Sequence, residues 1–176
     1  MRIAISGTHR SGKSTLIEEL STLLPKYRTV DEPYHLLVED GYEFSHPPSL
    51  EDFVAQLERS LQELSDETGD VLFDRCPIDW LAYISVHADA DEFDLDDWLP
   101  RVRAALRTMN WIVFVPIEDP DRIHFASSDD DDDSRELVDQ KLKELLLEDS
   151  LDLDVEVLEV EGEVGQRARS VMRRIR

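Results

Sequence analysis

A glycine-bounded stretch near the N-terminus constrains the fold more than any other feature of the chain. Residues 7–15 read GTHRSGKST and match the pattern G-x-x-x-x-G-K-[ST] at every fixed position. The largely apolar residues 2–6 before this stretch predict a buried strand, and apolar residues at helical spacing from Leu16 to Leu24 predict a helix. The stretch is therefore expected to form a loop between a strand and a helix.

These residue types, in this order, predict a binding site for the phosphates of ATP. Gly7 and Gly12 permit backbone conformations that turn successive N–H groups toward phosphate oxygens. The following helix adds its unpaired N–H groups and the positive end of its dipole. We expect Lys13 to reach the β- and γ-phosphates and the Ser14 hydroxyl to bind Mg²⁺. The predicted nucleotide-binding residues are Gly7, Thr8, His9, Arg10, Ser11, Gly12, Lys13, Ser14 and Thr15.

The composition disfavours several other classes of protein. The 176 residues carry 41 acidic and 19 basic side chains, a net charge of −22, which argues against binding of duplex nucleic acid through a basic face. No apolar run is long enough to cross a membrane, and the N-terminus leads directly into a strand, so we expect a cytoplasmic protein. Cys76 is the single cysteine, which excludes an intrachain disulfide.

Strand and helix patterns alternate along the whole chain. Segments typical of strands occur at residues 2–6, 27–30, 71–73, 111–115 and 155–160. Because helical patterns lie between them, we expect a three-layer α/β/α sandwich with a five-stranded, mainly parallel sheet, in one domain over residues 1–176.

Two segments show neither the strand pattern nor the helix pattern. Residues 34–48 mix aromatic side chains with glycine and proline, which predicts a long and partly ordered connection. Residues 119–134 contain the run Asp129–Asp133, which predicts a mobile segment with solvated carboxylates. A calcium loop would instead space its ligands around a central glycine, and this run has none.

Polar residues follow the predicted strands, at the edge of a parallel sheet where ligands bind. Glu32 could accept the proton of an attacking hydroxyl or hold metal-bound water, or it could be a solvated turn residue. Asp74 could organise Mg²⁺, or it could cap a helix that begins at Pro77. Arg75 could clamp a phosphate, or it could form a surface ion pair.

Together, the loop GTHRSGKST, the pair Glu32-Pro33 and the segment DRCPIDWLAY at residues 74–83 resemble P-loop nucleoside and nucleotide kinases. The likeness is greatest to the NadR-like kinase group, often catalogued as AAA-type ATPases, whose members carry DRxPxDxLAY in the second segment. The resemblance implies the strand order 2-3-1-4-5, ATP and Mg²⁺ as cofactors, and a small-molecule acceptor. It also implies that Asp74 and Glu32 hold metal or activate the acceptor hydroxyl, and that Arg75 contacts phosphate.

Further residues are implied by the same resemblance. Such kinases close an arginine-bearing lid over the phosphates, which corresponds here to a segment at about residues 119–146 with Arg122 and Arg135 as lid arginines. The aspartate run departs from this pattern, because it places negative charge in the lid. Gly162 and Arg167 lie where the loop beside the adenine is expected.

An acceptor site is expected beside these residues. Gln56 matches a position that meets the acceptor base in deoxynucleoside kinases. Trp80 and Tyr83, one helical turn apart, could line the acceptor pocket or belong to the core. The predicted catalytic residues are thus Lys13, Glu32, Asp74, Arg75, Arg122 and Arg135, and the predicted acceptor-binding residues are Glu32, Gln56, Trp80 and Tyr83.

The sequence therefore predicts ATP-dependent, Mg²⁺-assisted phosphoryl transfer to a nucleoside, a nucleotide or a compound like nicotinamide riboside. The alternative is an ATP-binding regulatory ATPase or switch protein without a small-molecule acceptor. No N-K-x-D sequence suggests a GTPase, and no LSGGQ-like signature suggests a transport ATPase. Acceptor-dependent production of ADP separates the two hypotheses.

The charge balance yields a prediction about salt. A large acidic excess with only four lysines is typical of proteins adapted to high salt, where screening removes self-repulsion. We expect the melting temperature to rise between low and molar KCl, measured by differential scanning fluorimetry. A melting temperature that does not rise with KCl would contradict this adaptation.

Overall fold

A parallel sheet forms the centre of the molecule, as the sequence predicts. The computed structural model describes residues 1–118 and 129–175, with the backbone alone for residues 129–133. Its strands are β1 (Arg2–Ser6), β2 (Arg28–Val30), β3 (Val71–Asp74), β4 (Trp111–Phe114) and β5 (Val157–Glu159). They run in the order β2-β3-β1-β4-β5, and all neighbours are parallel, which confirms the predicted order.

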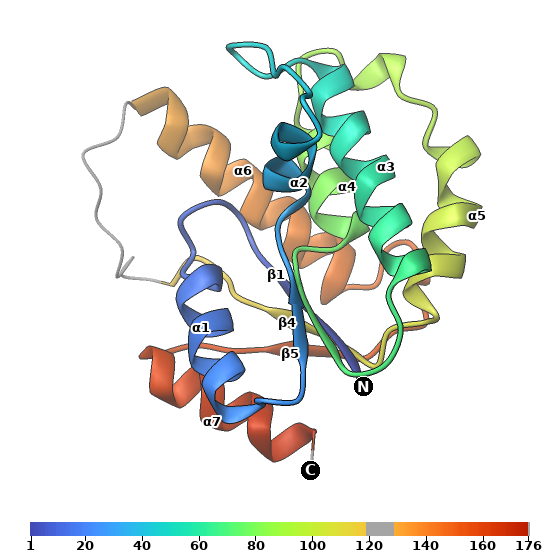
Figure 1. The fold of residues 1–176 in the computed structure, drawn as a ribbon. Coiled ribbons are helices and arrows are strands. Elements are labelled where there is room, and N and C mark those ends of the chain that lie inside the picture. Colours follow the sequence, from blue (N-terminus) through green and yellow to red (C-terminus); the bar gives the residue numbers. More distant parts are fainter. Residues whose placement is uncertain (119–128, 176) are drawn as a thin grey trace.

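Helices cover both faces of this sheet (Figure 1). The α-helices of the described residues are α1 (Lys13–Leu23), α2 (Pro33–Glu39), α3 (Leu50–Asp66), α4 (Pro77–Ser85), α5 (Leu95–Leu106), α6 (Asp129–Leu146) and α7 (Val164–Arg174). On one face α1 packs against α7, and on the other α4 packs against α3 and α6. The predicted three layers are therefore present.

Alternation of side chains along the strands divides the core into two layers. Successive residues of a strand point to opposite faces of a sheet. Ile3 and Ile5 of β1 are fully buried in the apolar cluster beneath α1 and α7. Ala4 lies in the other cluster with Phe73 of β3, against α3, α4 and α6. Strands that are apolar on both faces are expected where helices cover both faces of a parallel sheet.

The register of the strands brings the predicted functional segments to one edge. Ile5 of β1 pairs with Asp74 at the end of β3, and Ser6 pairs with Phe114 at the end of β4. Because the strands are parallel, the loop after β1, the residues after β3 and those after β4 leave the sheet side by side. This edge carries the site described below.

Two predictions of irregular structure are wrong in part. Residues 34–48 contain most of α2, a seven-residue helix that begins with Pro33 and buries only that residue, so it has no apolar stripe that a periodicity could reveal. The aspartate run is not a loop but forms the start of α6. The predicted mobility of residues 119–128 lies outside the described residues.

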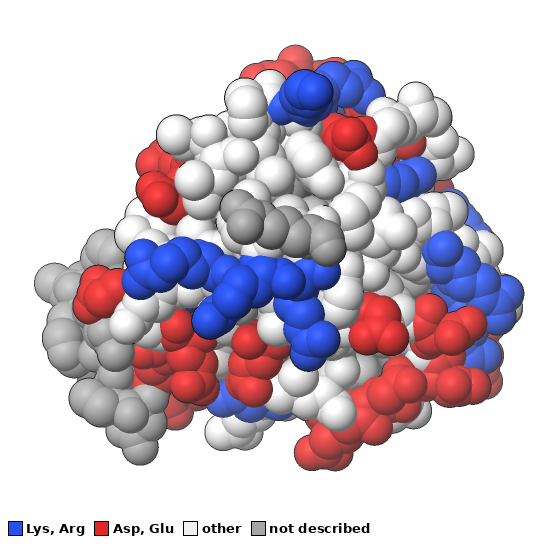
Figure 2. Space-filling view, turned by 90° about the horizontal axis from the view of Figure 1, so that it is seen from below, with Lys and Arg blue, Asp and Glu red and all other residues white. Residues whose placement is uncertain are grey.

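The surface charge is not distributed evenly. Figure 2 shows a band of basic side chains across a face that is otherwise flanked by acidic groups. Helix α7, at the bottom of Figure 1, exposes Arg169, Arg173 and Arg174. None of the helices that the structure describes is both long and apolar enough to traverse a lipid bilayer.

Asp52 ties the connection after α2 to helix α3. Its carboxylate is 2% exposed and accepts hydrogen bonds from Ser49 N–H at 2.8 Å, Ser45 N–H at 3.1 Å and the Tyr42 hydroxyl at 3.1 Å. The Asp52 N–H in turn donates to Ser49 Oγ, which completes a capping box.

The variant Asp52→Asn is expected to lower the free energy of unfolding by about 2 kcal/mol, because an amide NH₂ cannot accept the bonds that one carboxylate oxygen now accepts. Urea denaturation measures the change. Glu51→Gln, in the same helical turn but exposed, is the matched control and should change stability by less than about 0.5 kcal/mol. Equal effects of the two substitutions would contradict the anchoring role of Asp52.

Candidate active site

The phosphate loop lies between β1 and α1 in a conformation that requires glycine. Gly7 has φ 152° and Gly12 has φ 92°, which are values that L side chains rarely adopt. A Cβ atom on Gly7 would lie 2.5 Å from the carbonyl oxygen of Val115, a backbone atom that cannot move away. Arg10, with φ 55°, adds a third positive φ to the turn. The motif glycines therefore shape the loop as predicted.

Cationic side chains hold five consecutive carbonyl oxygens of this loop. The pairs are Arg75 Nη1 to Gly7 O at 2.8 Å, Lys13 Nζ to Thr8 O at 2.7 Å, Arg135 Nε to His9 O at 3.1 Å, Arg135 Nη2 to Arg10 O at 3.2 Å, and Arg167 Nη1 to Ser11 O at 3.0 Å. In a trans peptide the C=O and the following N–H point in opposite directions. The N–H groups of residues 10–12 are therefore left on the other side, where they can bind phosphate.

Lys13 is almost completely buried, with 5% of its surface exposed. Burial and the nearby Arg75 lower the pKa of Lys13 to about 8, against the opposing pull of Glu32, Asp74 and Asp79. A lysine with this pKa still carries its proton at neutral pH. The protonated ammonium group donates to the Thr8 carbonyl oxygen.

Asp74, at the end of β3, shares a cavity of about 510 Å³ with Ser14 and Glu32. Burial raises the pKa of Asp74 to about 6, assisted by Glu32 and opposed by Lys13. Its Oδ1 is buried and has no hydrogen-bond partner within the structure, so this oxygen is available to a cation or a water molecule. The helix-cap alternative is wrong, because Cys76 is the N-cap of α4.

The donor set at this cavity fits Mg²⁺ in part. A serine hydroxyl and a carboxylate are oxygen ligands, which Mg²⁺ prefers, and this ion usually takes its other ligands from water and phosphate. Among residues 1–118 and 134–175, no group of three or more histidine, cysteine or carboxylate side chains is placed to hold a metal by itself. The predicted metal residues Ser14 and Asp74 are thus brought together without forming a complete metal cage.

Glu32 borders both this cavity and a second one. It is the N-cap residue of α2, and its Oε1 accepts from Arg75 Nε at 2.6 Å. Burial alone would raise the pKa of Glu32, but Arg75 and Lys13 outweigh it and hold the pKa below its usual value. Glu32 is therefore an ion-paired carboxylate between two cavities and not a solvated turn residue.

Arg75 is a buried cation with partners on several sides. Its side chain is 4% exposed, and its guanidinium lies 5.2 Å from the centre of the Trp80 ring and 5.4 Å from that of Tyr83. Nearby Tyr83, Glu32 and Asp79 raise the pKa of Arg75 well above its usual value, although burial opposes them. The alternative of a surface ion pair is therefore wrong.

The second cavity, of about 560 Å³, has a largely aromatic wall. The ring of Tyr83 stacks against that of Phe53, with a distance of 5.4 Å between ring centres and an angle of 16° between ring planes. It also stacks against Trp80, with a distance of 5.8 Å and an angle of 29°. Tyr34 and Phe44 form a further ring pair at 4.5 Å. The lining includes His9, Glu32, Tyr34, Phe44, Phe53, Gln56, Arg75, Trp80 and Tyr83, so all four predicted acceptor residues border one cavity.

Sequence reasoning missed the role of Asp79. This carboxylate is completely buried, and its Oδ1 accepts from Gly7 N–H at 3.0 Å and from Arg75 Nη1 at 3.3 Å. Its Oδ2 accepts from Cys76 N–H at 3.0 Å. The third position of helix α4, which is favourable for an acidic capping residue, was the available signal.

Two of the remaining predicted residues, Arg135 and Arg167, bond to carbonyl oxygens of the loop. Glu118, which the sequence analysis did not identify, accepts from Gly162 N–H at 2.6 Å and from Arg167 Nη2 at 2.8 Å. Gly162 and Arg167 are thus brought together next to the phosphate loop. Arg135 is 6% exposed and contacts loop carbonyls, as given above. Arg122 lies outside the described residues.

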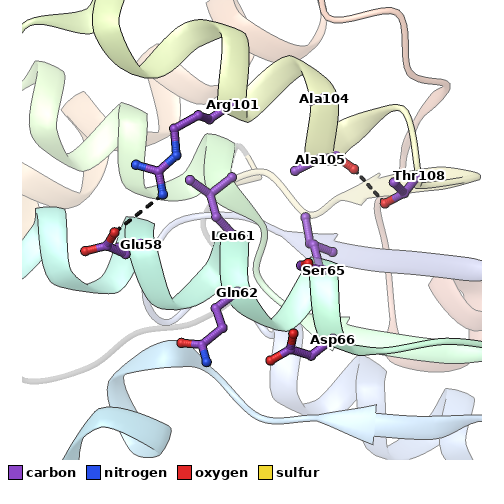
Figure 3. Close-up of a pocket in the computed structure, with 10 residues that line it drawn as sticks. Glu58, Leu61, Gln62, Ser65, Asp66, Arg101, Ala104, Ala105 and Thr108 are labelled. Atoms are coloured by element: carbon purple, nitrogen blue, oxygen red, sulfur yellow. Dashed lines mark hydrogen bonds and ion pairs between the residues drawn. The ribbon is translucent and has the colours of Figure 1, made fainter.

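Another cavity, of about 660 Å³, lies elsewhere. It is a groove between α3 and α5, closed at one end by the ion pair between Glu58 and Arg101 (Figure 3). No residue of the phosphate loop or of the strand ends lines it. The candidate site is therefore the pair of smaller cavities that meet at Glu32.

Comparisons with known proteins agree with this geometry. A family model described as an AAA domain, AAA_28, matches residues 2–167. The chain belongs to this family. A search of the curated proteins found no match.

Solved structures show that this AAA-domain protein has the fold of P-loop kinases. Deoxyadenosine kinase from M. mycoides with bound dATP is 19% identical, with a TM-score of 0.68 over 99% of each chain. Thymidylate kinase from Candida albicans is 16% identical, with a TM-score of 0.61 over 98% of this chain and 89% of that one. NadR protein in complex with NR is 18% identical, with a TM-score of 0.66 over 97% of this chain and 47% of NadR.

The raised pKa of Asp74 yields a prediction for stability. The pKa is about 6 in the folded state against a usual 3.8, so between these values the folded state binds a proton that the unfolded state does not. The contribution of Asp74 to the free energy of unfolding is therefore most favourable below pH 4 and is lost as the pH rises through 6. At pH 8 the ionised carboxylate costs up to about 3 kcal/mol.

Asp74→Asn should therefore be more stable than the parent protein at pH 8, and this difference should vanish near pH 4. Urea denaturation at the two pH values, at one salt concentration, measures it. Asp66→Asn, at an exposed position, is the control and should show no pH-dependent difference. A lower stability of Asp74→Asn at pH 8 would show that the carboxylate is stabilised and not strained by its surroundings.

Proposed function

We propose that this protein is an ATP-dependent kinase that transfers a phosphoryl group to a hydroxyl or phosphate group of a small acceptor with a flat ring, such as a nucleoside, a nucleotide or a nicotinamide-riboside-like compound. One observation carries the proposal: Glu32, paired with Arg75, borders both the cavity beside the phosphate loop and the aromatic cavity. Because Ser14 of the phosphate loop also lines the first cavity, a phosphoryl donor bound on the loop and an acceptor in the aromatic cavity would meet at this pair.

The donor half follows from the loop. The N–H groups of residues 10–12 and the N-terminus of α1 would bind the phosphates, with Lys13 as a mobile positive charge. Ser14 and Asp74 would hold Mg²⁺, which when bound neutralises charge on the phosphates. Gly162 and Arg167 would lie beside the donor base. Phosphoryl transfer depends mainly on positioning and charge stabilisation, which are what these residues offer.

The acceptor half follows from the aromatic cavity. The rings of Phe53, Trp80 and Tyr83 offer stacking surface, which favours a planar base over a flexible chain. Gln56 is 4% exposed and donates through Nε2 to Asp52 O at 3.0 Å, and its amide oxygen would accept a hydrogen bond from a base.

The reacting end of the cavity is polar. Glu32 is the only carboxylate among the described residues that line it, and it would accept a hydrogen bond from the acceptor hydroxyl. Its lowered pKa keeps it ionised at neutral pH. Arg75 would stabilise the charge of the transferred phosphoryl group. Asp74, the second candidate base, lies on the donor side.

The solved structures support this choice of acceptors. One is a deoxyadenosine kinase with bound dATP, one is a thymidylate kinase, and one is NadR in complex with NR. All three are less than 20% identical in sequence to this chain. The class of acceptor is therefore inferred from the cavity, and these proteins supply the candidate acceptors to be assayed.

The test measures ADP formation from Mg·ATP with a panel of nucleosides, nucleotides and nicotinamide riboside. We expect one acceptor class to raise ADP release, and to raise the melting temperature together with a non-hydrolysable ATP analogue, because ligands of the folded state stabilise it. Lys13→Ala should lower this turnover at least about 100-fold. Lys26→Ala, an exposed lysine, should leave it unchanged.

ADP release that no acceptor increases would overturn the kinase proposal and favour a regulatory ATPase. Unchanged turnover in Lys13→Ala would overturn the assignment of the phosphate loop.

A further inference from the structure

The hydroxyl group of Tyr83 is hydrogen-bonded to the phosphate loop. It accepts from His9 N–H at 2.9 Å and lies 3.0 Å from His9 Nδ1. A phenol hydroxyl can accept one hydrogen bond and donate another, which fits an imidazole whose Nδ1 is the acceptor. One hydroxyl group thus contacts both the backbone and the side chain of the same loop residue.

The ring of Tyr83 is fixed on its other sides. It stacks against Phe53 of α3 and Trp80 of α4, and the Arg75 guanidinium lies 5.4 Å from its centre. A tyrosine side chain has only two main torsion angles, and rotation about either would disrupt these contacts. The hydroxyl is therefore presented to the loop by a rigid support.

The same ring is part of the acceptor cavity. Tyr83, Phe53, Trp80 and His9 all line the cavity of about 560 Å³. Tyr83 thus has its ring in the wall that would contact an acceptor and its hydroxyl on the loop that would hold the donor. The contacts of Asp79 and Arg75 with Gly7 hold the start of the loop, whereas Tyr83 holds its middle on the N–H side of His9 and Arg135 holds it on the carbonyl side.

We propose that Tyr83 is a positioning residue whose hydroxyl fixes the phosphate loop relative to the acceptor cavity. The inference rests on the proposed kinase function, because it needs a donor on the loop and an acceptor in the cavity. The hydroxyl acts through His9 and sets the distance between the two reacting groups. A misplacement of about 1 Å between reacting groups can lower a rate about 100-fold, so one hydrogen bond at this point is consequential.

The variant Tyr83→Phe tests this role because it removes the hydroxyl and retains the ring. We expect kcat to fall about tenfold while the KM for the acceptor changes less than about twofold, since the stacking surface remains. Titration of active sites by a single-turnover burst separates a slower rate from a smaller folded fraction. Tyr27→Phe, which removes a hydroxyl before β2 at the opposite end of the strands, is the control and should leave kcat unchanged.

A second measurement needs no substrate. We expect the amide hydrogen of His9 to exchange with solvent at least about tenfold faster in Tyr83→Phe than in the parent protein, measured by NMR without ligands. Amide hydrogens in the strands should exchange as before, which excludes a general loss of stability.

Unchanged exchange at His9 would overturn the inference, as would a raised acceptor KM with unchanged kcat, which would assign the hydroxyl to acceptor binding. If no compound in the panel is phosphorylated, the proposed function fails, and the His9 exchange rate alone decides whether Tyr83 holds the loop. If an acceptor is phosphorylated equally fast by Tyr83→Phe, the kinase function stands and the positioning role does not.

Discussion

The buried guanidinium of Arg75 is the interaction on which the arrangement of the site depends. An unpaired charge in the interior costs several kcal/mol, so every neighbour of this group must help to neutralise or stack on it. Glu32 comes from the end of β2, Gly7 from the end of β1 and Asp79 from α4, and all three bond to Arg75. One cation therefore joins the three segments that form the boundary between the two cavities.

Other buried cations also donate hydrogen bonds to this loop, and two of them come from distant parts of the sequence. Lys13, Arg75, Arg135 and Arg167 are all buried, although the chain has only 19 basic residues. Each donates to a loop carbonyl, and Arg75 and Arg167 are also paired with the carboxylates of Glu32, Asp79 and Glu118.

The sequence was sufficient for the features that follow local patterns. The spacing of glycine, lysine and serine identified the loop, and the apolar segments identified the sheet whose order the structure confirms. It was insufficient where a role depends on contacts between distant residues. Asp79 and Glu118 act on groups 72 and 44 residues away, and no local pattern marks such a contact. Helix α2 is too short, and too exposed, to leave a periodic signal.

The two bonds to Gly7 have a consequence for motion. Asp79 accepts from its N–H and Arg75 donates to its C=O, so movement of the start of the phosphate loop relative to the first turn of α4 would break these two bonds. The passage of an acceptor in and a product out must then depend on other walls of the aromatic cavity. Residues 44–48 are such a wall, and Asp52 holds the connection that carries them through bonds from Tyr42, Ser45 and Ser49. Evolution or engineering could remodel this connection for a new acceptor while the donor half of the site stays intact.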